Sequence, residues 1–311
     1  MTQHLIHVGY PKAGSTFLQA WFEHHPELRY APGALGGFHN VYELGQPTDK
    51  NYKCYVTSFE GLSTPHESAG GVRLEFGGAE PAREDRVKEN QAAVCSVLKS
   101  LYPFSRILIV TRGFRGMILS AYSQYVRMGG TLYLEGMCRQ LAESLRNDAH
   151  HYFDYDYLLR LYGEAFGTDN LIVLPYELLR DDQNKFLAVI EEKLGLAHVE
   201  IKLGRVNPSL SPEELYWYPL MSRAVSAAAR QLGGRRFQRA YGWYAGKLLD
   251  NRLHRVVRVL RRMRPERKIS EADFPIDILN YCVGKATRLK DNPLYAPYAA
   301  EYLWDEQGTG A

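Results

Sequence analysis

The chain has 311 residues, of which 45% are hydrophobic and 23% are charged, and it carries a formal net charge of +3 at pH 7. This composition is that of an ordinary soluble globular protein, and the length suffices for one large α/β domain or a domain with a subdomain. No run of 18 apolar residues is present, which excludes a membrane-spanning helix. Residues 1–4 lack the features of a signal peptide, so we expect a cytoplasmic protein.

The cysteines and the charge distribution exclude some classes of site and suggest others. The four cysteines, Cys54, Cys95, Cys138 and Cys282, are widely spaced and form no C-x-x-C pair, which predicts reduced thiols rather than a zinc site or disulfides. Residues 230–268 hold 13 Lys and Arg against Asp250 and Glu266, a net charge of +11. Such a basic block suggests an anionic partner.

Short apolar segments alternate with helical patterns along the first 200 residues. Residues 4–9 predict a buried strand, and apolar side chains at helical spacing predict a helix over 15–22. Further strands are predicted at 55–59, 106–111 and 171–174, with helices at 118–126 and at 186–194, the last ending at Gly195. This alternation is typical of a doubly wound α/β fold with a central parallel sheet.

The remainder of the chain is predicted to be largely helical. Ser211, Pro212 and Glu214 have the spacing of a helix N-cap, a first-turn proline and a capping-box glutamate. The glycine-rich residues 33–37 and 63–78 are predicted to be surface loops. We expect a single domain over 1–311, with an α/β core over 1–200 and a helical, basic extension over 201–311.

The loop after the first strand carries a phosphate-binding pattern. It reads Gly9-Tyr10-Pro11-Lys12-Ala13-Gly14-Ser15-Thr16, and it has the G-x-x-x-x-G frame of a nucleotide phosphate loop. A P-loop kinase places lysine directly after the second glycine, whereas here the only lysine is Lys12, within the loop. In that position a lysine is closer to the bridging oxygen of a short anhydride. The fold we expect is therefore a P-loop-like three-layer α/β fold.

The segment from Pro11 to Thr16 matches a known family motif. It resembles the 5′-phosphosulfate-binding loop of sulfotransferases that use 3′-phosphoadenosine 5′-phosphosulfate (PAPS), which reads Pro-Lys-x-Gly-Ser/Thr-Thr. The resemblance implies cofactor contacts from Pro11, Lys12, Ala13, Gly14, Ser15 and Thr16. The alternative is a chance glycine-containing turn between a strand and a helix.

Two later segments resemble the same family. Arg112 ends the third predicted strand and Ser120 follows on a helix, which resembles the family element that holds the 3′-phosphate. Tyr176, in Pro175-Tyr176-Glu177-Leu178, resembles a family tyrosine beside the adenine, although a packing role is an equal alternative. Arg235, in Gly233-Gly234-Arg235-Arg236, is a looser match to a C-terminal 3′-phosphate element.

The catalytic base expected here differs in residue type from that of the cytosolic members of the family. Those members place a histidine before the 3′-phosphate arginine, whereas residues 88–91 contain none. Glycan-modifying relatives use a glutamate instead, shortly after a strand that follows the loop, and the segment around Glu60 resembles theirs. The resemblance implies Glu60 as the base beside the catalytic Lys12, with His66 and Glu67 as alternatives.

The resemblance implies an enzyme that moves a sulfuryl group from PAPS to a hydroxyl or amine and releases 3′,5′-adenosine bisphosphate (PAP). It implies no metal requirement, no nucleic-acid partner and an acceptor that is a carbohydrate or glycolipid. Two other functions remain open from the residues alone: a P-loop kinase for a small molecule or nucleotide that uses Mg-ATP, and a non-catalytic adenine-nucleotide-binding protein.

Residues 251–264 form a basic helical pattern. Apolar Leu253, Val256, Val257 and Leu260 recur at helical spacing and are flanked by arginines. One interpretation is a helix that contacts a membrane surface or a polyanion. The other, which we favour from the sequence, is a packed helix with a solvated charged face.

Overall fold

The computed structural model describes residues 3–30, 51–64, 87–146, 153–200, 210–231, 233–250, 252–260 and 274–304. The segment 33–37 and most of 63–78, which were expected to be loops, lie outside these ranges.

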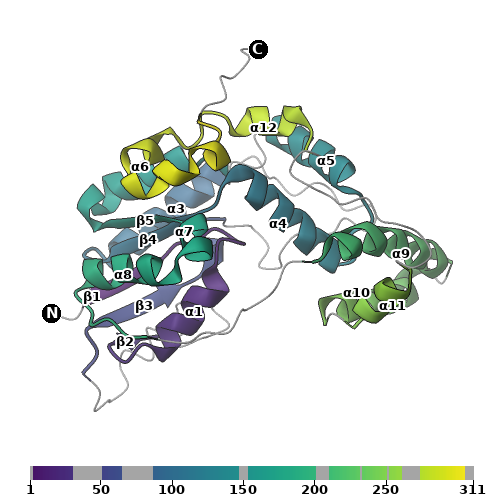
Figure 1. Ribbon diagram of the computed structural model, residues 1–311, viewed down its shortest axis with the longest axis horizontal. Coiled ribbons are helices and arrows are strands. Elements are labelled where there is room, and N and C mark those ends of the chain that lie inside the picture. Colours follow the sequence, from purple (N-terminus) through teal and green to yellow (C-terminus); the bar gives the residue numbers. More distant parts are fainter. Residues whose placement is uncertain are drawn as a thin grey trace.

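A parallel sheet forms the centre of the molecule, with the strand order β2-β3-β1-β4-β5 (Figure 1). The five strands are β1 (Gln3–His7), β2 (Leu28–Arg29), β3 (Cys54–Ser58), β4 (Arg106–Thr111) and β5 (Leu171–Pro175). Each neighbouring pair is parallel. The predicted parallel α/β fold is confirmed, and all four predicted strands are present. The sheet also contains a fifth strand, the two-residue β2, which is too short to give a sequence pattern.

Helices precede and follow the strands. Within the part of the chain that leads to residue 200 they are α1 (Ser15–His24), α3 (Val87–Leu101), α4 (Phe114–Arg127), α5 (Leu134–Arg146), α6 (Tyr155–Phe166), α7 (Tyr176–Asp181) and α8 (Gln183–Leu194). The short 3-10 helices η1 (Glu60–Leu62) and η3 (Thr168–Asn170) lie beside β3 and β5. Gly195 ends α8 in the left-handed conformation, as predicted from its position.

The direction of the chain across the sheet determines which face each helix covers. From β1 the chain moves outward to β2, whereas from β3 to β4 and from β4 to β5 it moves in the opposite direction. Because crossovers between parallel strands are right-handed, α1 lies on one face while α3 and α6 lie on the other. Figure 1 shows this arrangement, with α8 on the same face as α1.

The same change of direction makes a topological switch point between β1 and β4. The connections that leave β1 and β4, which are adjacent strands, run in opposite directions. In parallel α/β sheets such a point lies at the carboxyl ends of the strands and is the usual ligand position. The phosphate-loop pattern after β1 and Arg112 after β4 therefore lie at this edge.

The later part of the chain is helical. It contains α9 (Pro212–Arg230), α10 (Gly234–Leu249), α11 (His254–Leu260), α12 (Ile276–Cys282), η5 (Thr287–Asp291) and η6 (Pro293–Tyr302). The predicted capping box of α9 is present, with Ser211 and Glu214 bonding reciprocally. No helix among the described residues is both long and apolar enough to span a bilayer.

The end of the described chain returns to the core. The hydroxyl oxygens of Tyr295 and Tyr302 lie 2.8 Å and 3.0 Å from the Thr111 hydroxyl, at the end of β4. Both tyrosines are buried. Residues far beyond position 200 thus help to form the edge of the sheet where the loops after β1 and β4 meet. The expected division of the chain near residue 200 stays a prediction.

Candidate active site

Two residues with positive φ angles determine the backbone conformation of the loop between β1 and α1. Lys12 adopts a left-handed conformation with φ 67°, and Gly14 follows with φ 86°. A Cβ atom on Gly14 would lie 2.6 Å from the Cδ2 atom of Leu179 on α7. Glycine is needed here both for its positive φ and for this close approach. The left-handed lysine costs conformational energy, which the surrounding contacts must offset.

The first turn of α1 is suited to an anion. Gly14 occupies the N-cap position, no side chain caps the helix, and no acidic residue lies in its first turn. The first amides of a helix have no intrahelical acceptor and lie at the positive end of its dipole. Ser15 is buried, with its hydroxyl 3.5 Å from the Tyr10 carbonyl oxygen, and Thr16 is exposed. These features favour a phosphate at residues 14–16.

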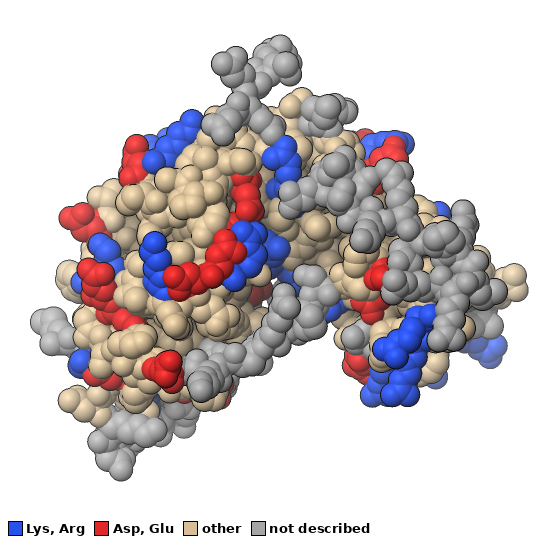
Figure 2. All heavy atoms as spheres, viewed as in Figure 1, with Lys and Arg blue, Asp and Glu red and all other residues tan. Residues whose placement is uncertain are grey.

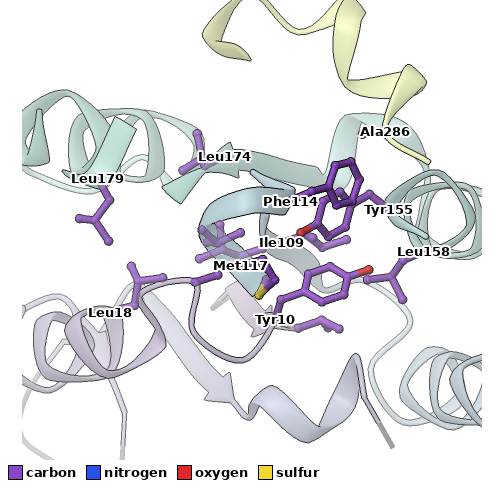
Figure 3. Close-up of a cluster of buried hydrophobic side chains, with 14 of the residues drawn as sticks. Tyr10, Leu18, Ile109, Phe114, Met117, Tyr155, Leu158, Leu174, Leu179 and Ala286 are labelled. Carbon is purple, nitrogen blue, oxygen red and sulfur yellow. The ribbon is translucent and has the colours of Figure 1, made fainter. Parts of the chain in front are cut away.

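An aromatic cluster below the loop ties it to the end of β4. The ring of Tyr10 packs edge-on against Tyr155, with centroids 4.9 Å apart, and Tyr155 stacks on Phe114 at 5.1 Å (Figure 3). The Tyr155 hydroxyl donates to the Arg112 carbonyl oxygen at 2.6 Å. All three rings are buried. The core therefore holds the loop after β1 and the turn after β4 in fixed relation.

Arg112 links the loop after β1 to Tyr176 at the start of α7. Its guanidinium donates from Nη1 to the Lys12 carbonyl oxygen at 2.7 Å. The same guanidinium lies over the ring of Tyr176, with its Cζ atom 4.4 Å from the centroid. A Cβ on Gly14 would lie 3.3 Å from that ring. The structure thus brings together the loop, Arg112 and Tyr176, which come from three distant segments.

One face of α4 continues the site beyond Arg112. A Cβ on Gly116 would lie 3.2 Å from the Arg112 Nε atom, so the arginine side chain crosses the first turn of this helix. Ser120, Gln124 and Arg127 follow Gly116 at four-, four- and three-residue steps, which places them on the same face. The Lys12 Nζ atom donates to the Gln124 Oε1 atom at 3.3 Å. Ser120, which is buried, thus lies between the two contacts.

The charge of Lys12 is affected by its neighbours. Burial lowers the pKa of Lys12 below its ordinary value. The positive charges of Arg127 and Arg112 lower this pKa further, and the carboxylate of Glu60 raises it.

Gln124 and Arg127 are functional candidates that the sequence analysis missed. Their spacing from Ser120 was a usable signal, because positions i, i+4 and i+7 share one helix face.

Glu60 begins η1 at the carboxyl end of β3, which pairs with β1. The hydroxyl of Ser63 lies 2.7 Å from the Gly9 carbonyl oxygen and 3.0 Å from that of Glu60, so it links this turn to the phosphate loop. Gln91 on α3 donates to the Ser63 carbonyl oxygen at 2.6 Å. The partly buried Glu60 therefore lies on the Lys12 side of the site, on a supported turn.

A buried glutamate supports the turn that carries Arg112. The Gly113 amide donates to the Glu177 Oε1 atom at 2.9 Å, and the Tyr302 hydroxyl donates to Oε2 at 3.0 Å. Burial raises the pKa of Glu177, and these hydrogen bonds act in the opposite direction. Glu177 was part of the motif around Tyr176, but its structural role was not predicted.

Replacing Glu177 by alanine is expected to lower the free energy of unfolding by about 1–3 kcal/mol, because the buried Gly113 amide loses its acceptor. Glu177→Gln, which keeps an oxygen at that position, is expected to lose less. Because the pKa of the folded state is raised, the glutamate itself contributes less stability as pH rises from about 4.5 towards that pKa. Denaturant unfolding of the three proteins measures these differences, and equal stability of Glu177→Ala and wild type would contradict the assigned role.

Among the described residues, one predicted site residue is not joined to this cluster. Arg235 lies exposed in the first turn of α10, and its role stays a prediction. His66 and Glu67, the alternative bases, lie outside the described residues.

Comparison with known proteins gives weak likenesses only. No protein-family model matches the chain, and no curated protein matches it. Among solved structures, the chain is similar to a sulfotransferase from Alicyclobacillus acidocaldarius, with 15% identity, a TM-score of 0.46, and coverage of 83% of this chain and 99% of that one. It is also similar to mouse sulfotransferase SULT7A1 complexed with PAP, with 16% identity, a TM-score of 0.38, and coverage of 84% and 87%. At such TM-scores, an assignment of function depends on the geometry of the site itself.

Proposed function

We propose that this protein is a PAPS-dependent sulfotransferase, which moves a sulfuryl group from PAPS to an acceptor hydroxyl or amine. One observation carries the proposal: at the carboxyl ends of β1 and β4, Arg112 donates to the Lys12 carbonyl oxygen and covers the Tyr176 ring. Three segments that each resemble a part of one cofactor-binding site therefore meet at one place. A phosphate loop with its lysine at the centre, beside an arginine at a strand end, suits a donor with two separate phosphate groups.

The donor would be held at both ends. In the proposal, the amides of Gly14, Ser15 and Thr16 bind the 5′-phosphate at the start of α1, which carries no acidic residue in its first turn. Arg112 and Ser120 bind the 3′-phosphate, because the arginine side chain runs along the face of α4 that contains Ser120. Tyr176 lies beside the adenine. Pro11 and Ala13 complete the loop, and Arg235 is retained as a candidate 3′-phosphate ligand.

The proposed chemistry is an in-line displacement at sulfur. The acceptor oxygen or nitrogen forms a bond to sulfur while the bond from sulfur to the bridging oxygen breaks, and that oxygen leaves with its electron pair on PAP. Glu60 takes the acceptor proton, and Lys12 stabilises the negative charge that develops on the bridging oxygen. Lys12 and Glu60 are close enough for the carboxylate to influence the pKa of the lysine. The proposal includes no metal ion.

The acceptor class is part of the proposal. A glutamate base and the basic block over residues 230–268 favour a carbohydrate or glycolipid, and no nucleic acid is involved. Arg127 adds a positive charge beside Lys12 on the side of the site away from Arg112, which suits an acceptor that carries a negative group. The proposed compartment is the cytoplasm, where the four buried cysteines would stay reduced.

The affinities of PAP and AMP test this arrangement, because AMP lacks only the 3′-phosphate. Wild type is expected to prefer PAP over AMP, and Arg112→Ala is expected to reduce that preference by about ten- to a hundredfold, since a charge-assisted grip on one phosphate is lost. Ser120→Ala should reduce the preference by a smaller factor. Calorimetric titration measures both ligands on each variant.

Arg115 gives a matched control for this experiment. It also lies in the first turns of α4, but its guanidinium approaches the Ala300 carbonyl oxygen at 3.4 Å rather than the phosphate loop. Arg115→Ala is therefore expected to keep the preference for PAP. If Arg112→Ala weakens PAP and AMP by the same factor, Arg112 does not hold the 3′-phosphate.

A further inference from the structure

Exposed apolar side chains are concentrated on α10 and α11. Among the described residues, eight large apolar side chains are exposed, and four of them lie between residues 243 and 259. These four are Trp243 (68% exposed), Leu249 (52%), Val256 (42%) and Val259 (60%). The sequence pattern placed Val256 in a buried stripe, but of the two adjacent valines only Val257 is buried. Exposed apolar side chains gathered on one part of a surface are typical of an interaction site.

On α10 the exposed tryptophan is aligned with basic residues. Arg236, Arg239, Trp243 and Lys247 follow one another at three- and four-residue steps, so they share one side of the helix. The Lys247 Nζ atom lies 5.2 Å from the centroid of the Trp243 ring. The opposite side of the helix is buried, and it packs against α9 and the end of α4. The stripe therefore faces away from the protein.

On α11 the same combination recurs. Arg255, Val256 and Val259 have the spacing of one outward side of the helix, and the exposed Arg252 lies in the turn just before it. Val257 is buried, and the helix packs on α9. The Arg252 amide donates to the Lys247 carbonyl oxygen at 3.0 Å, which joins the start of this stripe to the end of the first. We call these two stripes together the basic–apolar face.

Both helices pack on α9, and both lie below it in Figure 1. Figure 2, in the same view, shows Lys and Arg side chains gathered along the lower edge of this part of the molecule. The only acidic residue in the described part of residues 230–260 is Asp250, against eight Lys and Arg. The face thus combines a strong positive charge with apolar side chains that protrude between the cationic ones.

We propose that the basic–apolar face docks on an anionic phospholipid bilayer. Charge complementarity argues for an anionic partner, because positive charges near a surface are attracted to anionic headgroups. The exposed tryptophan and valines favour a bilayer over a soluble polyanion, because apolar side chains can insert between the lipid headgroups at the membrane surface. The contact is peripheral, and it does not depend on the reaction that the protein catalyses.

Sedimentation with lipid vesicles tests this proposal. The full-length protein is expected to bind vesicles that contain phosphatidylglycerol much more tightly than vesicles of phosphatidylcholine alone, and added salt is expected to weaken the binding. The double variant Arg236→Glu/Arg239→Glu should bind at least about tenfold more weakly, because each basic residue near the bilayer contributes attraction. Lys185→Glu/Lys193→Glu on α8 is the matched control, with the same change of charge on exposed lysines elsewhere, and it should bind like wild type.

The apolar part of the face is tested separately. Trp243→Ser and Val259→Ser, both at exposed positions, are expected to weaken vesicle binding while circular dichroism and thermal unfolding stay unchanged. A blue shift of tryptophan fluorescence on vesicle addition, absent in Trp243→Ser, would report insertion of this side chain. Binding to dextran sulfate but not to anionic vesicles would overturn the proposal in favour of a polyanion. Vesicle binding that the arginine or tryptophan variants leave unchanged would overturn it as well.

Discussion

Glu60→Gln is expected to lower the rate of sulfuryl transfer by about 10²–10⁴-fold, the usual range for loss of a general base. Glutamine has nearly the same shape as glutamate but cannot take the acceptor proton. The turn that carries Glu60 is linked to the phosphate loop through the Ser63 hydroxyl, and this link is unaffected by the substitution. The affinity for PAP should therefore remain within about twofold of wild type, since no phosphate ligand is changed.

The measurement is release of PAP from PAPS in the presence of a panel of hydroxyl and amine acceptors, followed by anion-exchange chromatography. Glu164→Gln, at an exposed position on α6, makes the same chemical change elsewhere and should keep wild-type turnover. Near-normal turnover of Glu60→Gln would assign the base to another residue. A parallel loss of PAP affinity and turnover would instead indicate a damaged loop.

Lys12→Met is expected to lower turnover by about 10²–10³-fold, the range found when one donor to a developing oxyanion is removed. Methionine keeps most of the aliphatic length of lysine but carries no charge. Because the Lys12 carbonyl oxygen is a backbone atom, its hydrogen bond from Arg112 can remain in this variant. The affinity for PAP should fall by a much smaller factor, since PAP no longer carries the bond that breaks.

Two comparisons make the Lys12 result specific. Lys185→Met removes an exposed lysine from α8 and should leave turnover unchanged. Lys12→Arg keeps the positive charge and should recover part of the lost turnover. If Lys12→Met reduces turnover and PAP affinity by the same factor, Lys12 contributes uniform binding and does not stabilise the transition state.

The sequence predicted the fold well because its signals are local. The apolar segments 106–111 and 171–174 are continuous, as central parallel strands must be, and both are strands in the structure. The capping box at Ser211 and the left-handed Gly195 are likewise specified by neighbouring residues. The two-residue β2 has no such pattern, and it is formed by its pairing with β3.

The sequence motifs of the candidate site follow strand ends, and the structure places those strand ends at one edge of the sheet, while the roles of the residues stay predictions. The contacts between the motifs were not predictable, since they depend on tertiary geometry. That Arg112 reaches the Lys12 carbonyl oxygen, that Glu177 holds the Gly113 amide, and that Lys12 reaches Gln124 all require the packing of separate elements. The exposure of Val256 and Val259 on α11 was missed for a related reason, because periodicity alone cannot tell which apolar side a neighbouring helix covers.

The most direct test of the central claim is calorimetric titration of the wild-type protein with PAP, beside ATP with Mg²⁺. The site has a lysine at the centre of its loop and an arginine at the end of β4, which suits two separate phosphates better than a metal-bound triphosphate. We expect PAP to bind tightly without a metal ion, and Mg-ATP to bind much more weakly. A preference for Mg-ATP would contradict the sulfotransferase proposal and favour a kinase.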